Sequence, residues 1–372
     1  MNDDAGDRLF GAGAPLHIAD QGYFFVGGEY VESADGARMS GQMFVQYQIP
    51  ARRSSRYPIV MIHGGGQTGT NFLGTPDGRR GWADYFVANG YAVYVVDQPG
   101  RGRSGYFPDR YGPGVHRGTR TTEGRFTAPE NAQLWPQARH HTQWPGAGTQ
   151  GDAVFDQFYA SQVEGMRDVA QIERLVRAAG AALLDRIGAS ILLTHSQSGP
   201  FGWTIADARP KLVKAIVAVE PQGAPVHEIR FLGVEGDALR YADEAEVTRP
   251  WGVTRGPLTF DPPVADATQM KFIKQPAPDA PDLVACWLQA EPARKLVNLA
   301  GIPILIVTAE ASYHAPYDHC TSRFLAQAGV EHDFVRLAEA GIRGNGHMMM
   351  LERNNLEIAA YFRKWLRDKV ET

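Results

Sequence analysis

The segment Leu192–Gly199 holds the residues with the clearest chemical potential. Its sequence, LLTHSQSG, places Ser196 and Ser198 directly after a short apolar run. A serine at an abrupt strand-to-helix turn exposes its hydroxyl, and its neighbours must be small because the turn is strained and closely packed. Thr194 and Ser198 stand where the G-x-S-x-G form of this motif has glycines. We predict Ser196 as a nucleophile, with the alternative that these serines only cap an ordinary helix.

A glycine-rich segment, His63–Gly66, follows another short apolar run at residues 59–62. Glycines let the backbone approach a group on which negative charge develops, and backbone N–H groups can then stabilise that charge. We expect the N–H groups of Gly65 and Gln197 to form such an oxyanion hole. Taken alone, the tetrapeptide could also be a plain glycine turn. The sequence DQPGRGRS at 97–104 follows the next apolar run, and we expect it to shape a turn without a catalytic role.

A general base is expected at His347, in the glycine-containing segment 344–347 near the end of the chain. Imidazole has an ordinary pKa of about 6.5, which suits it to remove a serine proton at neutral pH. The orienting acid is open among three carboxylates that follow apolar runs, Glu220, Glu310 and Asp318. Glu220 follows its run without a spacer, which would hold it buried and fixed, as an orienting acid must be. Position alone does not decide among them.

Other residues that could carry chemistry fit less well. The zinc-ligand types His314, Asp318, His319 and Cys320 are close in sequence, but their spacing matches no metal motif. The pair His140-His141 lacks the glutamate and the spacing of H-E-x-x-H, and no strand-like run is followed by a nucleotide-binding glycine motif or a P-loop lysine. Three arginines lie in the segment 117–125, which we interpret as a solvated loop. We therefore predict no metal and no cofactor.

Short apolar runs and amphipathic stretches alternate between these candidates. Continuous apolar runs predict parallel strands that are covered on both faces. They lie at 59–62, 92–96, 190–193, 215–219, 304–307 and, shorter, 334–337. Apolar residues at helical spacing predict helices at 82–89, 158–176 and 356–366. The alternation predicts an α/β fold with a mostly parallel central sheet and helices on both faces.

We interpret the 372 residues as one α/β domain, although domains of about 100–200 residues would allow two or three. The β-rich runs 22–28 and 43–49 predict an N-terminal β extension over about residues 17–50. Two segments interrupt the alternation, about 106–151 and about 223–281, and both are rich in proline. We expect them to be lid or cap insertions at the carboxyl edge of the strands, where ligands bind in open α/β sheets.

Composition and charge exclude several classes of protein. Hydrophobic residues make up 44% of the chain and charged residues 21%, which is ordinary for a folded enzyme and excludes a disordered chain. A net charge of −4 argues against a nucleic-acid partner, and no apolar run is long enough to span a bilayer. The two cysteines, Cys286 and Cys320, could be bridged or free.

The first residues, Met1–Asp4, are acidic, and no apolar segment follows that would mark a secretory signal. A signal removed before the numbering begins would leave the same sequence. We therefore expect a cytoplasmic protein, or a periplasmic or secreted one if such a signal was removed. The sequence is also compatible with a homodimer.

Three motifs in combination resemble a known family. From Gly22–Gly28 (GYFFVGG) through Arg101–Ser104 (RGRS) to His195–Gly199 (HSQSG), the chain is similar to the bacterial esterase family typified by the Alcaligenes esterase 713, in the α/β-hydrolase superfamily. The resemblance implies that the serine of HSQSG is the nucleophile, that a glutamate after the sixth strand is the acid, and that a histidine near the C-terminus is the base. In this chain these residues are Ser196, Glu220 and His347. Members of the family can carry adjacent cysteines where this chain has Gly65 and Gly66.

The residues and the resemblance together predict a serine hydrolase that cleaves carboxylic esters through a Ser-His-Glu triad and an acyl-enzyme. Its expected partner is a small-molecule ester. The same triad could instead open a lactone, transfer an acyl group to another alcohol or hydrolyse a C–C bond. A non-catalytic binding protein on the same fold is a further alternative.

Overall fold

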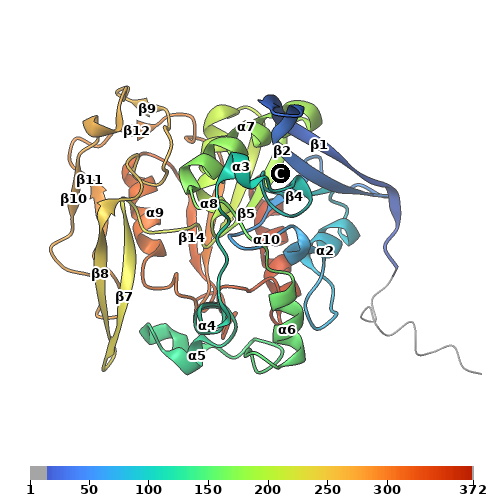
Figure 1. Ribbon diagram of the computed structural model, residues 1–372. Coiled ribbons are helices and arrows are strands. Elements are labelled where there is room, and N and C mark those ends of the chain that lie inside the picture. Colours follow the sequence, from blue (N-terminus) through green and yellow to red (C-terminus); the bar gives the residue numbers. More distant parts are fainter. Residues whose placement is uncertain (1–14, 371–372) are drawn as a thin grey trace, which may run out of the picture.

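Residues 15–370 are described by the computed structural model, and within them one eight-stranded sheet forms the centre of the molecule (Figure 1). The acidic first residues, on which the expectation about a secretory signal rests, lie outside the described residues. Neighbouring strands are parallel from β4 to β14, whereas β1 and β2 form an antiparallel hairpin that joins the sheet through β4. The spatial order is β1 (Ile18–Ser33), β2 (Gly36–Pro50), β4 (Val93–Asp97), β3 (Ile59–Ile62), β5 (Ser190–His195), β6 (Val213–Val219), β13 (Ile304–Thr308) and β14 (Asp333–Arg336).

All six apolar runs form parallel strands of this sheet, as the sequence predicts. Successive side chains of a strand point to opposite faces, so each inner strand contributes to two cores. Val60 and Ile62 of β3 belong to the core that includes residues of α7 (Val169–Ile187) and α8 (Ser198–Ala208). The neighbouring Ile59 and Met61 belong to the other core, with α2 (Trp82–Ala88) and α10 (Asn355–Val370). The expected α/β fold with helices on both faces is confirmed.

The helix expected over 158–176 is wrong in its first half. Two helices occupy the region, α6 (Ala153–Ala160) and α7, with a non-helical connection between them. The Asp168 side chain accepts a hydrogen bond from the Gln171 N–H at 3.0 Å and so begins α7 there. Met166 belongs to the same core as α7, but from the connection, which is why the apolar spacing looked continuous. Among the described residues, no helix is both long and apolar enough to cross a membrane.

The two segments expected to be insertions differ in structure. The first contains short helical elements: α3 (Pro108–Tyr111), α4 (Thr119–Thr122), the π-helical η3 (Glu123–Thr127), α5 (Pro129–Ala132) and the 3-10 helix η4 (Pro136–His140). The second begins with a long hairpin that sequence analysis did not predict, β7 (His227–Glu235) with β8 (Ala238–Val247). Two smaller strand pairs follow: β9 (Phe260–Asp261) with β12 (Lys295–Leu296), and β10 (Phe272–Lys274) with β11 (Trp287–Gln289). The remaining short elements are α1 (Thr70–Leu73), η2 (Gly102–Ser104) and η5 (Ala267–Gln269).

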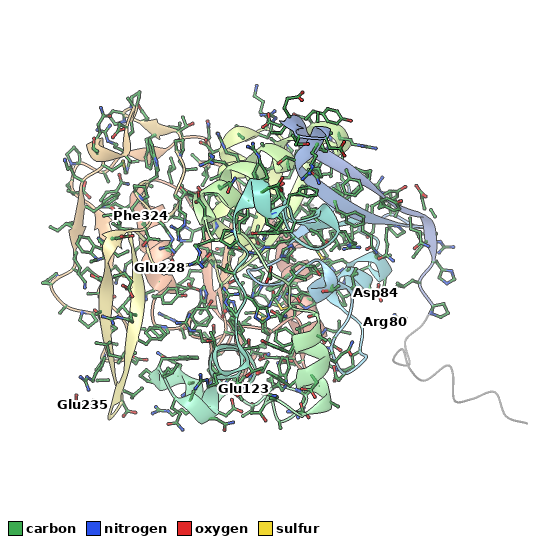
Figure 2. The ribbon with its side chains drawn as sticks, in the orientation of Figure 1. Arg80, Asp84, Glu123, Glu228, Glu235 and Phe324 are labelled. Atoms are coloured by element: carbon green, nitrogen blue, oxygen red, sulfur yellow. A yellow bond between two sulfur atoms is a disulfide. The ribbon has the colours of Figure 1, made fainter. Side chains whose placement is uncertain are left out.

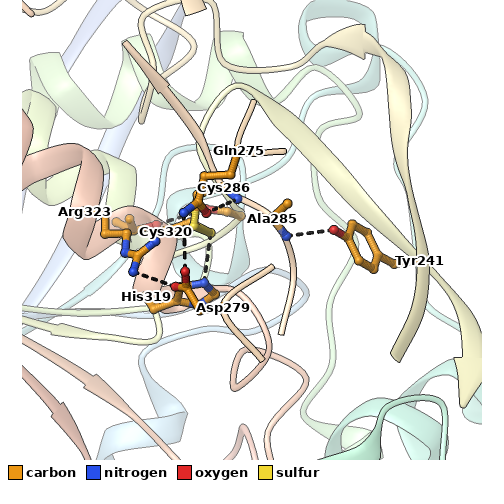
Figure 3. Close-up of a disulfide and its surroundings, with 10 residues drawn as sticks. Tyr241, Gln275, Asp279, Ala285, Cys286, His319, Cys320 and Arg323 are labelled. Atoms are coloured by element: carbon orange, nitrogen blue, oxygen red, sulfur yellow. Dashed lines mark hydrogen bonds and ion pairs between the residues drawn. A yellow bond between two sulfur atoms is a disulfide. The ribbon is translucent and has the colours of Figure 1, made fainter. Parts of the chain in front are cut away.

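A disulfide and an aromatic contact attach this second group of strands to α9 (Asp318–Gln327). Cys286 and Cys320 are bridged, which decides between the two states that the sequence left open (Figure 3). One turn further along α9, Phe324, which is labelled in Figure 2, contacts Phe272 of β10, with ring centroids 6.4 Å apart. The strands outside the central sheet are therefore joined to its framework by a covalent bond and by buried apolar surface.

Candidate active site

Ser196 lies at the turn between β5 and α8, in a strained backbone conformation. Its φ is +56°, in the left-handed region, which costs a non-glycine residue about 1–3 kcal/mol. The surrounding backbone fixes this conformation. The Ser196 N–H donates to the Val219 carbonyl at 3.0 Å, and the Ser196 carbonyl accepts from Gly199 and Gln222 at 2.9 and 2.8 Å. The sharp turn expected from LLTHSQSG is therefore present, with Ser196 at its apex.

The second serine of the motif has a different function in the fold. Ser198 is fully buried, and its hydroxyl donates to the Ile62 carbonyl at 2.6 Å and accepts from the His195 N–H at 2.8 Å. It thus links the ends of β3 and β5. The alternative that these serines cap an ordinary helix is wrong, because Gln197 is the N-cap of α8 and makes no side-chain capping bond.

Glu220 and His347 meet in the buried interior beside this turn. The His347 Nδ1 is hydrogen-bonded to the Glu220 Oε2. Glu220 stands directly after β6 with φ +48°, and it also accepts from the Ala309 N–H at 2.8 Å and the Ser312 hydroxyl at 2.7 Å. Both side chains are almost fully buried. The structure therefore brings together the two residues that the sequence resemblance paired.

Tyr313 lies beside His347, and sequence analysis missed it. Its hydroxyl lies 3.5 Å from the His347 Nε2, and the Ser196 side chain is near enough to affect the pKa of the phenol. Desolvation raises the pKa of Tyr313 to about 12, so the phenol stays protonated and can donate a hydrogen bond. No sequence signal marks this tyrosine, because it stands in an irregular loop after β13 with no motif around it.

Burial opposes charge on both members of the pair. It lowers the pKa of His347 well below 6.5, and the nearby His195, His314, Arg117 and Arg125 lower it further. Burial and the nearby Asp318 raise the pKa of Glu220, against the hydrogen bonds from Ala309 and Ser312. At neutral pH the imidazole of His347 is therefore neutral, the form in which its Nε2 can accept a proton.

The two other candidate acids have different partners. The Glu310 carboxylate pairs with the Arg343 guanidinium at 3.0 Å and accepts from the Gly344 N–H at 2.8 Å. Asp318 binds the His314 Nδ1 at 2.8 Å and the Thr308 hydroxyl at 2.7 Å. Neither carboxylate contacts the imidazole of His347 in the described structure. Geometry therefore favours Glu220 as the orienting acid.

The segment after β3 presents its backbone to Ser196. A Cβ on Gly64 would lie 3.1 Å from the Ser196 Cβ, so glycine permits the close approach. The Gly64 carbonyl accepts from the His63 Nδ1 at 2.8 Å and from Arg101 at 3.4 Å. Burial lowers the pKa of His63 to about 4, so this ring is neutral, and its Nε2 accepts from the Gln98 N–H at 3.0 Å.

The fixed Gly64 carbonyl also sets the direction of the next N–H. In a planar trans peptide the carbonyl and the following N–H point in opposite directions. The Gly65 N–H is therefore directed away from His63 and Arg101. Within residues 15–370 the N–H groups of Gly65 and Gln197 donate to no protein acceptor. Both predicted oxyanion donors thus remain available.

A second buried histidine–carboxylate pair supports the loop that carries His347. The His141 Nδ1 and Nε2 contact Glu130 at 2.6 Å and Glu352 at 2.8 Å. Glu352 in turn accepts from the Gly346 N–H at 2.9 Å and from the Asn345 side chain at 2.7 Å. The sequence around His141 matches no metal motif, and it gives no indication that this histidine positions the loop.

The residues considered as zinc ligands divide into two separate groups. His314 pairs with Asp318 beside His347, with the rings of the two histidines stacked at 4.8 Å. Cys320 is bonded to Cys286 in the disulfide, and the His319 Nε2 lies 3.5 Å from the Cys320 sulfur (Figure 3). The four residues close in sequence therefore do not converge on one point.

Comparisons with known proteins show the family to which the chain belongs. A family model described as "Alpha/beta hydrolase family" matches residues 59–361, so the chain belongs to this family. A protein of Fungal sp. (strain ATCC 74256), named probable secreted lipase phiG, is 47% identical over 345 residues, covering 92% of this chain and 88% of the relative. A solved structure of a novel bacterial esterase is 25% identical with a TM-score of 0.64, covering 97% of this chain and 99% of its own. The lipase and the esterase place the chain with hydrolases of the carboxylesterase type.

The His141 network predicts a pH dependence of stability. Burial disfavours its charge, but the hydrogen bonds and charges of Glu130 and Glu352 raise the pKa of His141 from 6.5 to about 9. The stabilisation should be complete below pH 6.5 and lost as the pH rises through about 9, on the order of 3 kcal/mol in the free energy of unfolding. Denaturant unfolding at a series of pH values should show this decline in the wild type and not in His141→Gln. Equal pH profiles for the two proteins would contradict the assignment.

Proposed function

We propose that this protein is a serine hydrolase of carboxylic esters, with Ser196 as nucleophile, His347 as general base and Glu220 as orienting acid. One observation carries the proposal. A buried, neutral imidazole bonded to a buried carboxylate lies beside a serine in a strained turn, with the Tyr313 hydroxyl 3.5 Å from the imidazole. A strained serine of this kind favours catalysis over simple binding, because strain is retained where function needs it.

The reaction follows from these positions. The His347 Nε2 takes the hydroxyl proton as the Ser196 Oγ attacks the ester carbonyl carbon. The carbonyl electron pair moves to oxygen, and the N–H groups of Gly65 and Gln197 stabilise that oxyanion, each by about 3 kcal/mol. Collapse breaks the ester C–O bond, and His347 returns the proton to the leaving alcohol. Water then repeats the sequence on the acyl-enzyme, which releases the acid and regenerates Ser196.

Glu220 is assigned the orienting role because its position is fixed on every side. Its three hydrogen bonds keep the carboxylate facing the imidazole, so the His347 Nδ1 keeps its proton and Nε2 remains the accepting atom. The same carboxylate stabilises the imidazolium that forms when the serine proton is taken.

We further propose that the protein works in an oxidising compartment or outside the cell. Disulfides form and persist under such conditions, and Cys286 and Cys320 are bridged. The 47% identical relative carries the name of a probable secreted lipase, which agrees with this assignment.

The nucleophile is tested by covalent labelling. A phosphonate ester should modify Ser196, and mass spectrometry of the trapped peptide should locate the adduct there. Ser196→Ala should lose labelling and all but a trace of ester hydrolysis while keeping the wild-type unfolding transition.

Ser198→Ala is the matched control. It should remain labelled at Ser196 but lose about 1–3 kcal/mol of stability, because the partners of its buried hydroxyl become unsatisfied. An adduct on Ser198, or full activity in Ser196→Ala, would show that the nucleophile is assigned wrongly.

The acid is tested by two substitutions that preserve volume. Glu220→Gln should lower kcat by at least about a hundredfold, because the imidazole loses the partner that fixes its tautomer. Glu310→Gln should lower kcat by less than about tenfold, since a glutamine can still accept from the Gly344 N–H. Steady-state kinetics on one activated ester compares the two. The reverse order would move the acid to the loop after β13.

A further inference from the structure

Three arginines surround the candidate active site without a carboxylate partner. The Arg117 Nη1 donates to the Gly65 carbonyl at 2.8 Å, and the Arg101 Nη1 donates to the Gly64 carbonyl at 3.4 Å. The Arg125 guanidinium lies over the Tyr313 ring, 5.5 Å from its centre. Within residues 15–370 none of the three forms an ion pair with an aspartate or glutamate. Neighbouring charges of the same sign in a folded protein are usually paired with opposite charges. Because these arginines have no carboxylate partner, we expect an anionic ligand to supply one.

Two of these guanidiniums each contact an aromatic ring that in turn contacts the imidazole of His347. Arg117 lies 5.7 Å from the centre of the Phe126 ring, which stacks on His347 at 5.4 Å. Arg125 lies over Tyr313, whose ring centre is 4.7 Å from that of His347. Arg117 and Arg125 are exposed to solvent, whereas Arg101 is buried. A substrate bound at Ser196 can therefore meet Arg117 and Arg125.

The acidic groups nearby are already engaged. Glu220 binds His347, Asp318 binds His314, and Glu352 binds His141. Glu123, which lies between Arg117 and Arg125 in the sequence, accepts from the Gln150 N–H at 3.0 Å and pairs with neither arginine. None of these four carboxylates forms an ion pair with Arg117 or Arg125, so both guanidiniums can still pair with a carboxylate of a bound ligand.

We propose that Arg117 and Arg125 bind a carboxylate that the ester substrate carries near its scissile carbonyl, an inference that rests on the proposed ester hydrolysis. The two oxygens of a carboxylate match the planar guanidinium fork, and such a pair holds a ligand in one orientation. The segment interpreted as a solvated loop from its sequence is in this view the specificity element of the enzyme. Arg101 has a different part, since it is buried and holds the Gly64 carbonyl.

Paired substrates that differ by one charge test the proposal. Mono-4-nitrophenyl adipate and its methyl ester place the charge on the acyl side, and 4-acetoxybenzoate and its methyl ester place it on the alcohol side. In at least one pair, kcat/KM for the anion should exceed that of the neutral ester by about tenfold or more, after correction for spontaneous hydrolysis. Added salt should lower this ratio, because the guanidiniums are exposed. A ratio near one in both pairs would overturn the proposal.

Substitutions of Arg117 and Arg125 test whether these two residues cause the preference for anionic esters. Arg125→Gln and Arg117→Gln should each reduce the anion-to-neutral ratio by about tenfold. The ratio is the readout because Arg117 also holds the Gly65 carbonyl, so its loss affects both members of a pair. Arg120→Gln is the matched control, an exposed arginine of the same segment, and should leave the ratio at the wild-type value. A ratio unchanged in both Arg117→Gln and Arg125→Gln would also overturn the assignment.

The two hypotheses fail differently. If the wild type cleaves the neutral esters and Ser196→Ala does not, ester hydrolysis stands whatever the charge preference. If neither the neutral nor the charged esters are cleaved, the proposed function itself fails.

Discussion

The buried hydrogen bond between Glu220 and His347 is the contact on which the rest of the site depends. Burying two ionisable groups costs free energy unless their hydrogen bonds are made, and Ala309 and Ser312 complete those of the carboxylate. Glu220 and Ser196 both stand in left-handed backbone conformations directly beyond neighbouring parallel strands. The Glu220 N–H donates to the carbonyl of Val307, near the end of the adjoining strand β13. The Ser196 N–H donates to the carbonyl of Val219, the last residue of the adjoining strand β6. The carboxyl edge of the sheet therefore holds both strained residues in place.

A neutral imidazole surrounded by cations gives the site its electrostatic character. The positive charge of Arg117 and Arg125 disfavours a further charge on His347 and at the same time attracts anions. Arg117 is anchored by its own carbonyl, which accepts from the Tyr159 hydroxyl of α6 at 2.8 Å. The segment 106–151 therefore contacts the candidate site at two points, through Arg117 at the Gly65 carbonyl and through His141 at Glu352.

Much of this architecture could be predicted from the sequence, for identifiable reasons. The six strands were found because doubly covered strands must be continuously apolar, and Ser196, Glu220 and His347 stand in or beside recognisable motifs. The break between α6 and α7 was missed because Met166 is buried without being helical. Tyr313 and the Arg117–Arg125 pair were missed because their importance lies in distances across the fold. The β7–β8 hairpin was missed because its strands carry mixed polar and apolar residues with little burial.

The most direct test of the central contact is the pH dependence of kcat/KM for an uncharged ester, with activity re-measured at neutral pH to show that the fold survived each exposure. A buried His347, with a pKa well below 6.5, stays neutral through the whole neutral range. The value of kcat/KM should therefore be level from about pH 8 down to about pH 6.5 and fall only at lower pH. An acid limb with an apparent pKa of about 7 or above would contradict a His347 base whose charge is disfavoured by burial and by the surrounding cations.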